Sequence, residues 1–134
     1  MARLKGSLGV ASGIGWLRIV VGVALTLAPR AVLASENDDA VSGALVLMTR
    51  TVGIRDIVVG AGALAAARAG DRDDLRRWVS VGLFSDVLDA AMGASSAGLV
   101  GKRGALRSAL APMPVIVADV YALSMLNATE EHNL

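Results

Sequence analysis

The sequence predicts an all-α protein, a four-helix transmembrane bundle in which an Arg/Asp network faces inward. Three observations carry this prediction. Hydrophobic residues make up 54% of the 134-residue chain and its mean hydropathy is +0.60, whereas soluble domains are usually about 45–50% apolar. Four long apolar stretches lack the alternation of β-strands, and charged residues lie inside all four stretches. The length fits a single domain over residues 1–134.

The first two predicted helices cover residues 8–28 and 41–67. The first should stop at Pro29, because proline interrupts a continuing helix. A polar segment, residues 30–40, should separate the two helices. A stretch of 20 helical residues spans about 30 Å, the hydrocarbon thickness of a bilayer. Both stretches are therefore long enough to cross a membrane.

The third and fourth predicted helices cover residues 78–97 and 105–127. We expect the densely charged segment 68–77 to be a solvent-exposed turn in which residues 71–74 cap the third helix. A Gly-, Lys- and Arg-containing turn should precede the fourth helix. Pro112 and Pro114 predict a kink there, or a late start.

The N-terminus also resembles a signal peptide, since Arg3 and Lys5 precede an apolar run and residues 32–34 resemble a cleavage site. The run is too long for an ordinary signal sequence, and Arg18 lies at its centre. We therefore interpret it as the first membrane helix.

Charged residues inside apolar stretches are the most informative feature of the chain. An ionised group in hydrocarbon costs from a few to more than ten kcal/mol, so such groups must pair or serve a function. Arg50 lies about 7–8 Å along the helix axis from the common depth of the others. The seven candidate ion-network residues are Arg18, Arg50, Arg55, Asp56, Asp86, Asp89 and Asp119.

Small residues accompany most of these charges at helical spacing. Membrane helices approach one another closely along stripes of small residues, so we expect the charges to point inward. Adjacent helix residues point about 100° apart, so Arg55 and Asp56 should reach different neighbours rather than each other. The small-residue faces are Gly15-Arg18-Gly22, Gly53-Asp56-Gly60 and Gly82-Asp86-Asp89-Gly93, while Asp119 shares its face with Val115, Ala122 and Leu126.

The proposed layer holds three arginines and four aspartates, and arginine stays protonated in proteins. Full ionisation would leave one excess negative charge. We expect one carboxyl to be protonated at pH 7, in the Asp86/Asp89 pair, because two close carboxylates do not both ionise readily. A bound cation or ligand amine would balance the charge equally well.

Several function classes lack support in the composition. The chain has no cysteine, which excludes disulfides, thiolate metal sites and thiol catalysis. Its only histidine, His132, lies in the C-terminal tail, and its net charge of +1 gives no case for nucleic acid. No phosphate-binding glycine loop or nucleophile motif occurs. We therefore predict no catalytic residue, metal or cofactor.

The distribution of basic residues favours a multi-pass plasma-membrane protein with both termini in the cytoplasm. In that orientation six basic residues lie inside and four outside. The inside set is Arg3, Lys5, Arg68, Arg72, Arg76 and Arg77, and the outside set is Arg30, Lys102, Arg103 and Arg107.

Residues 50–60, RTVGIRDIVVG, resemble an R-x-x-G-x-R-D-x-x-x-G pattern of small membrane proteins grouped as domain-of-unknown-function family 4267. These look related to the DoxX-like group, and Arg18 followed by Gly22 is similar to that group's opening pattern. Asp86 and Asp89 match an acidic position of its third helix. The resemblance implies four transmembrane helices and carries no established activity. The name hints at quinone or thiol redox chemistry, which nothing else in this chain supports.

The leading functional hypothesis is a non-enzymatic accessory or small-ligand-binding membrane protein, in contact with membrane lipids and in a homo-oligomer or larger membrane complex. A proton- or ion-coupled carrier is the first alternative, and it predicts a water-filled cavity reaching Asp86 or Asp119. A membrane enzyme acting on a lipid or quinone is the second, and it predicts a substrate-sized cleft beside the carboxylates. A soluble helical bundle is the remaining alternative.

Overall fold

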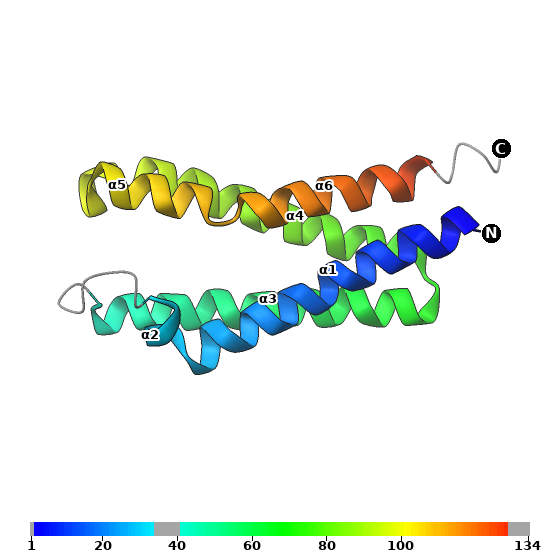
Figure 1. Ribbon diagram of the computed structural model, residues 1–134, viewed down its shortest axis with the longest axis horizontal. Coiled ribbons are helices and arrows are strands. Elements are labelled where there is room, and N and C mark those ends of the chain that lie inside the picture. The colour runs from blue at the N-terminus through cyan, green and yellow to red at the C-terminus, as the bar shows by residue number, and fades with distance from the viewer. Residues whose placement is uncertain (1, 34–40, 129–134) are drawn as a thin grey trace.

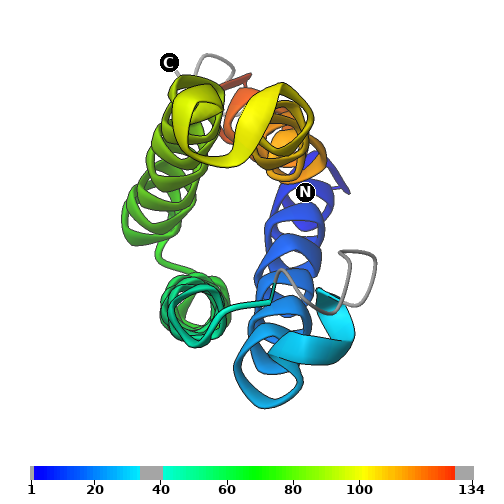
Figure 2. The same cartoon turned by 90° about the vertical axis from the view of Figure 1, so that its left-hand side faces the viewer.

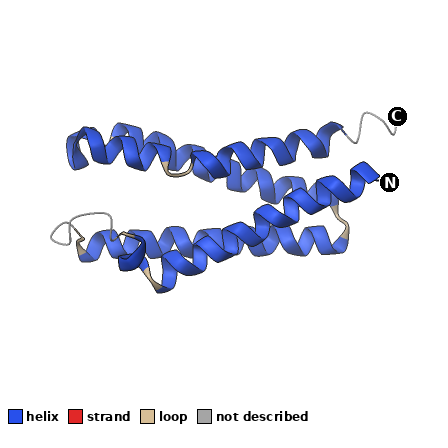
Figure 3. Cartoon of the chain, viewed as in Figure 1, coloured by secondary structure: helices blue, strands red, loops and turns tan. Residues whose placement is uncertain are grey.

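The structure is a computed structural model that describes residues 2–33 and 41–128, and every described regular element is a helix (Figure 3). This confirms the predicted all-α class. The helices are α1 (Ala2–Leu27), α2 (Pro29–Val32), α3 (Gly43–Ala69), α4 (Arg72–Ser95), α5 (Ala97–Leu110) and α6 (Met113–Ala128).

Local sequence explains the ends of α1 and α3. α1 ends at Leu27, and Pro29 then begins the single turn of α2, because proline suits the first position of a helix. The Ser42 hydroxyl accepts a hydrogen bond of 3.2 Å from the backbone N–H of Leu45 and caps the start of α3. α3 ends at Ala69, and Gly70 caps it with a φ of 71°, a left-handed conformation that favours glycine.

The charged segment 68–77 differs from its prediction as a turn. Only residues 70 and 71 separate α3 from α4. Arg68 lies in the last turn of α3, and the charged residues from Arg72 to Arg77 form the start of α4. The Asp71 carboxylate caps α4 by accepting a 3.0 Å hydrogen bond from the N–H of Asp74. Asp73 and Asp74 occupy the first helical turn, where negative charge is favourable at the positive end of the helix dipole. High charge density therefore extended this helix rather than ending it.

The predicted fourth helix, residues 105–127, is two helices in the structure. α5 begins earlier, at Ala97, and α6 follows after a break at Ala111 and Pro112. The chain reverses direction near Gly101, whose φ of 74° interrupts α5. The proline therefore separates two helices, as the kink prediction anticipated, and the glycine forms the expected turn.

The long helices run alternately in opposite directions along one axis (Figure 1). The N-terminus, the α3–α4 turn and the end of α6 lie together at one end, and α5 lies at the other. α1 packs most extensively on α3, and α4 packs on α3, α5 and α6, while α1 contacts α6 far less. Seen along the axis, α1, α3, α4 and α6 form a ring in that order (Figure 2).

α1 and α3 approach closely where their glycines face each other. A Cβ atom on Gly22 would lie 2.5 Å from the carbonyl oxygen of Gly53, and one on Gly60 would lie 2.5 Å from that of Gly15. No side chain fits at such distances without displacing a backbone. The small-residue faces predicted for these two helices therefore form their contact.

Apolar packing is concentrated at the end that carries the termini. Leu75 and Leu126 are completely or almost completely buried there, and Trp78 packs against the same cluster. The buried members of this core are Ala11, Ile14, Ala63, Ala66, Leu75, Val79, Ala122 and Leu126.

Two stretches are long and apolar enough to cross a membrane by length and composition: Leu8–Leu27 of α1, and Ala97–Ala128, which contains α5, the break and α6. Only 28% of the first window and 17% of the second are buried inside the protein. Large apolar side chains such as Leu27, Phe84 and Val117 point outward. The outer surface of the protein is therefore rich in hydrocarbon side chains.

Candidate functional site

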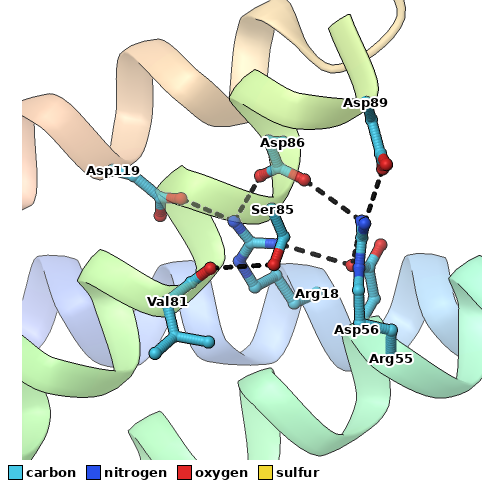
Figure 4. A network of polar contacts seen from close by, with 8 residues as sticks. All are labelled: Arg18, Arg55, Asp56, Val81, Ser85, Asp86, Asp89 and Asp119. Atoms are coloured by element: carbon cyan, nitrogen blue, oxygen red, sulfur yellow. Dashed lines mark hydrogen bonds and ion pairs between the residues drawn. The ribbon is translucent and has the colours of Figure 1, made fainter. Parts of the chain in front are cut away.

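A network of buried ion pairs lies at the middle of the helices, next to the apolar core, and Arg18 on α1 is its deepest cation (Figure 4). Its Nη2 donates to Oδ2 of Asp86 and to Oδ2 of Asp119, each at 2.5 Å. Its Nη1 donates to Oδ1 of Asp56 at 3.4 Å. Arg18 is only 3% exposed. One guanidinium therefore connects α1 to α3, α4 and α6.

Arg55 on α3 is the second cation of the network. Its Nη1 donates to Oδ2 of Asp89 at 2.6 Å, and its Nη2 donates to Oδ1 of Asp86 at 3.2 Å. Nη2 also donates to Oδ1 of Asp56 at 3.1 Å, so the expectation that Arg55 and Asp56 would not reach each other was wrong. The two Cα–Cβ bonds point about 100° apart, but the arginine side chain is long enough to reach back to the Asp56 carboxylate. The direction of the Cα–Cβ bonds alone does not show this.

Asp86 on α4 joins the two cations. Its Oδ2 accepts from Arg18 and its Oδ1 accepts from Arg55. Gly82, one turn earlier on α4, makes room for this arrangement, since a Cβ there would lie 2.7 Å from Nη2 of Arg18. The glycine of the predicted small-residue face thus lets a guanidinium lie against the helix backbone.

The structure brings together six of the seven predicted residues and leaves Arg50 outside, with an exposed side chain. Arg50 precedes Arg55 by five residues, which places it about 140° around the helix from Arg55. The network therefore contains two arginines and four aspartates, and full ionisation would leave two excess negative charges rather than one.

Burial divides the network into a deep part and an accessible part. Asp119 is 0% exposed, and Arg18 and Asp86 are also buried. The side chains of Arg55 and Asp89 are 27% and 41% exposed. The Arg55–Asp89 pair is therefore the part of the network that a ligand can approach.

A cavity of about 650 Å³ adjoins the accessible part of the network, on the side away from the apolar core. α1, α3, α4, α5 and α6 all contribute to its lining. Network residues in the lining are Arg18, Arg55, Asp56, Asp86 and Asp89; the other lining residues are Leu17, Val21, Leu25, Leu45, Met48, Thr49, Val52, Met92, Gly93, Ser96, Leu99, Ser108, Ala111, Pro112 and Val115. Most of the wall is thus apolar and the charged residues are gathered at one place.

The break before α6 and the position of α5 explain why this space exists. A Cβ on Gly93 would lie 2.7 Å from the backbone of Ser108, so α5 packs closely on α4. α1 has no comparable contact with α5. Pro112, at the break, lies in the cavity wall. No sequence signal identified the wall residues, because they carry no distinctive chemistry and come from five helices that only the fold brings together.

One carboxylate oxygen of the fully buried Asp119 has no hydrogen-bond partner in the described part of the chain. Its Oδ1 has no hydrogen-bond partner among the described residues, whereas both oxygens of Asp86 accept from arginine. An unpaired ionised oxygen is costly to bury, and protonation reduces that cost. The geometry therefore makes Asp119 a further candidate for the protonated carboxyl, beside the predicted Asp86/Asp89 pair.

Infrared difference spectroscopy tests this assignment. We expect a protonated-carboxyl band that grows as the pH falls below 7 in the wild type, is retained in Asp89→Asn and is lost in Asp119→Asn, because only the latter substitution removes the carboxyl with a buried unpaired oxygen. A band that instead disappears in Asp89→Asn and persists in Asp119→Asn would place the proton in the Asp86/Asp89 pair.

The described residues contain no group of three His, Cys, Asp or Glu side chains placed to hold a metal ion. Searches of family models, curated proteins and solved structures found no match to this chain.

Proposed function

We propose that this chain is an integral membrane protein whose helices form a four-helix transmembrane bundle, and that it binds a small ligand without transforming it. The cavity carries this proposal, because it combines apolar walls with a charged network at one place. Pockets of about 300–1,000 Å³ with mostly apolar linings and few polar groups are typical ligand sites.

Burial supports the membrane part of the proposal. A core helix of a soluble protein is mostly buried, whereas the two apolar stretches here are mostly exposed. α3 and α4 contain 27 and 24 residues, so each is longer than the roughly 30 Å thickness of the hydrocarbon layer. Four of their charged residues, Arg55, Asp56, Asp86 and Asp89, are paired across the helices, which lowers the cost of placing them in a bilayer.

The ion pairs also support a membrane helix over a signal peptide at the N-terminus. Arg18 lies at the centre of the first apolar stretch and pairs with carboxylates of three other helices. Removal of this stretch would leave Asp119 without its arginine. We propose that α1 stays in the mature protein, which lies in the plasma membrane with both termini in the cytoplasm.

Alkaline carbonate extraction of membranes tests this location. We expect the full chain to stay in the membrane pellet, because its apolar outer surface would be stable only against lipid. We also expect it to keep its N-terminal sequence, because α1 carries Arg18 of the ion network. A peripheral protein of similar size should appear in the supernatant of the same sample. Release of this chain into the supernatant would contradict the proposal.

The chemistry around the cavity supports binding rather than catalysis. Thr49, Ser96 and Ser108 line the cavity. The Thr49 and Ser96 hydroxyls donate to the backbone carbonyl oxygens of Leu45 and Gly93, and none of the described lining residues is a histidine that could serve as a base for Ser108. A nucleophile would need an adjacent base. Met48 and Met92 lie in the wall, and methionine adapts to ligands of different shape.

Filling the cavity tests ligand binding. We expect Val115→Trp, in the cavity wall, to weaken binding of octanol at least about tenfold, because the indole would occupy the space and remove the apolar contact. Val117→Trp is the matched control, since Val117 lies on the same helix, is 67% exposed and does not line the cavity. Binding can be measured by titration calorimetry in lipid discs. Equal weakening by both substitutions, or none by either, would contradict a cavity site.

A proton- or ion-coupled carrier is the second candidate, favoured by a cavity that reaches Asp86 and by the excess of carboxylates over arginines. Asp119 is not in the cavity lining, so a proton path to it would need further opening. Proton uptake by liposomes that contain the protein, driven by a ligand gradient, distinguishes a carrier from a binding protein.

Kinship with the DoxX-like group is also part of the proposal. The resemblance centres on residues 50–60, and Gly53, Arg55, Asp56 and Gly60 of this segment all take part in the α1–α3 contact or the ion network. These roles give a physical reason for such a motif. The exposed apolar surface would contact lipids or other membrane subunits, including a second copy.

A further inference from the structure

We propose that the ligand is an amphipathic primary amine, whose ammonium group binds at Asp89 while its hydrocarbon body lies along the apolar wall. This inference rests on the proposed ligand-binding function and names the chemical class of the ligand. It follows from the charge of the network, the contacts of Asp89 and the composition of the wall.

The charge of the network selects a cation. Four aspartates share two arginines. Even with one protonated carboxyl, one excess negative charge stays in surroundings of low polarity. A ligand cation would neutralise it, and a ligand anion would be repelled.

The geometry selects Asp89 as the contact. Asp89 lies in the cavity lining, and its side chain is the most exposed of the four carboxylates. Within the described part of the chain its Oδ2 accepts from Arg55, while Oδ1 has no bond. One carboxylate oxygen is thus held in place and the other is open to a donor from the cavity. An ammonium N–H is the strong donor that fits a carboxylate.

The lining selects a primary amine over other cations. Among the described residues no cluster of three acidic or histidine side chains could ligate a metal ion. None of the described lining residues is aromatic, whereas quaternary ammonium groups are recognised by aromatic faces. Recognition here would depend on N–H donors, which a primary ammonium has and a quaternary one lacks.

The apolar wall of the cavity indicates that the ligand carries a hydrocarbon chain. Leucine, valine and methionine side chains extend from α1, α3 and α4 beside the charged residues, including Val21, Met48 and Met92. Burying an alkyl chain on such a surface is favourable in proportion to the apolar area covered. The same chemistry is offered by a free amphipathic amine and by the headgroup of an aminophospholipid.

Titration calorimetry of the full chain in phosphatidylcholine discs tests the ligand class, with empty discs as blank. The probes are octylammonium, octyltrimethylammonium, octanol and octanoate at pH 7. We expect octylammonium to bind about tenfold or more tightly than octanol, because a charge-assisted hydrogen bond is added. Octyltrimethylammonium and octanoate should lack this advantage.

Asp89→Asn should remove the advantage of octylammonium over octanol, and circular dichroism of the variant shows whether it is folded. Asp73→Asn is the matched control on the same helix, since Asp73 is 85% exposed and lies outside the cavity lining. It should behave as the wild type.

Equal binding of octylammonium and octanol, tighter binding of octanoate, or equal binding of octyltrimethylammonium would each overturn the proposed ligand class. If octanol still binds to the wild type and binds more weakly to Val115→Trp, a ligand site in the cavity would remain supported. If no probe binds, octanol included, the proposed ligand-binding function fails as well.

Discs that contain phosphatidylethanolamine distinguish the two sources of the amine. Loss of octylammonium binding in these discs would identify the lipid headgroup as the amine that occupies the site. Unchanged binding would identify a free amine. Either result supports recognition of a primary ammonium.

Discussion

Arg18→Leu should cause a large loss of stability, of about 3–5 kcal/mol, because it leaves buried carboxylates without their cation. Asp119 would lose its only partner among the described residues, and Asp56 and Asp86 would each keep only Arg55. Thermal unfolding in lipid discs, followed by circular dichroism, measures the effect. We expect a much lower unfolding temperature or loss of folded protein.

Arg50→Leu is the matched control, since it removes the same side chain from the same kind of helix outside the network. It should change stability little. The double variant Arg18→Leu/Asp119→Leu should recover part of the loss, because removing both partners of a buried ion pair is far less costly than removing one. An Arg18→Leu protein as stable as the wild type would show that the network does not hold the helices together.

Gly53→Leu should have the second large effect, because it separates α1 from α3. A Cβ on Gly53 would lie 2.6 Å from the carbonyl oxygen of Gly22 and 2.9 Å from the Cβ of Leu25. Both neighbours belong to a packed helix, so the helices must move apart. Overpacking of this kind costs about 1–3 kcal/mol or more, and the movement would also displace Arg18 from Asp56.

The matched control is Gly43→Leu, at the start of the same helix, where an added Cβ has no neighbour within 4 Å. It should be neutral or slightly stabilising, because glycine is a poor helix former. Thermal unfolding of both variants in discs gives the comparison. Equal stability of the two variants would contradict the close α1–α3 contact.

The ion network combines a structural part and an accessible part. Arg18 and Asp119 are buried and connect the helices, so their loss should affect folding first. Arg55 and Asp89 are partly exposed and lie in the cavity lining, so Asp89→Asn should affect binding first. We therefore propose that Arg18 and Asp119 serve the structure and that Asp89 serves binding.

The sequence by itself determined the all-helical class and the inward direction of Arg18, Asp56, Asp86 and Asp119. A period of 3.6 residues fixes which residues share a face, and apolar surroundings require that charges on that face meet partners. The glycines beside Arg18 and Asp56 also indicated where α1 and α3 would touch.

Only the tertiary structure decided which charges meet and where space is left. Periodicity describes one helix at a time, so it could not show that Arg50 lies outside the network or that Arg55 bends to Asp56. The cavity is lined by residues of five helices, and Pro112 at the break before α6 lies in its wall. Contacts between helices distant in sequence follow from packing, and packing is a property of the whole fold.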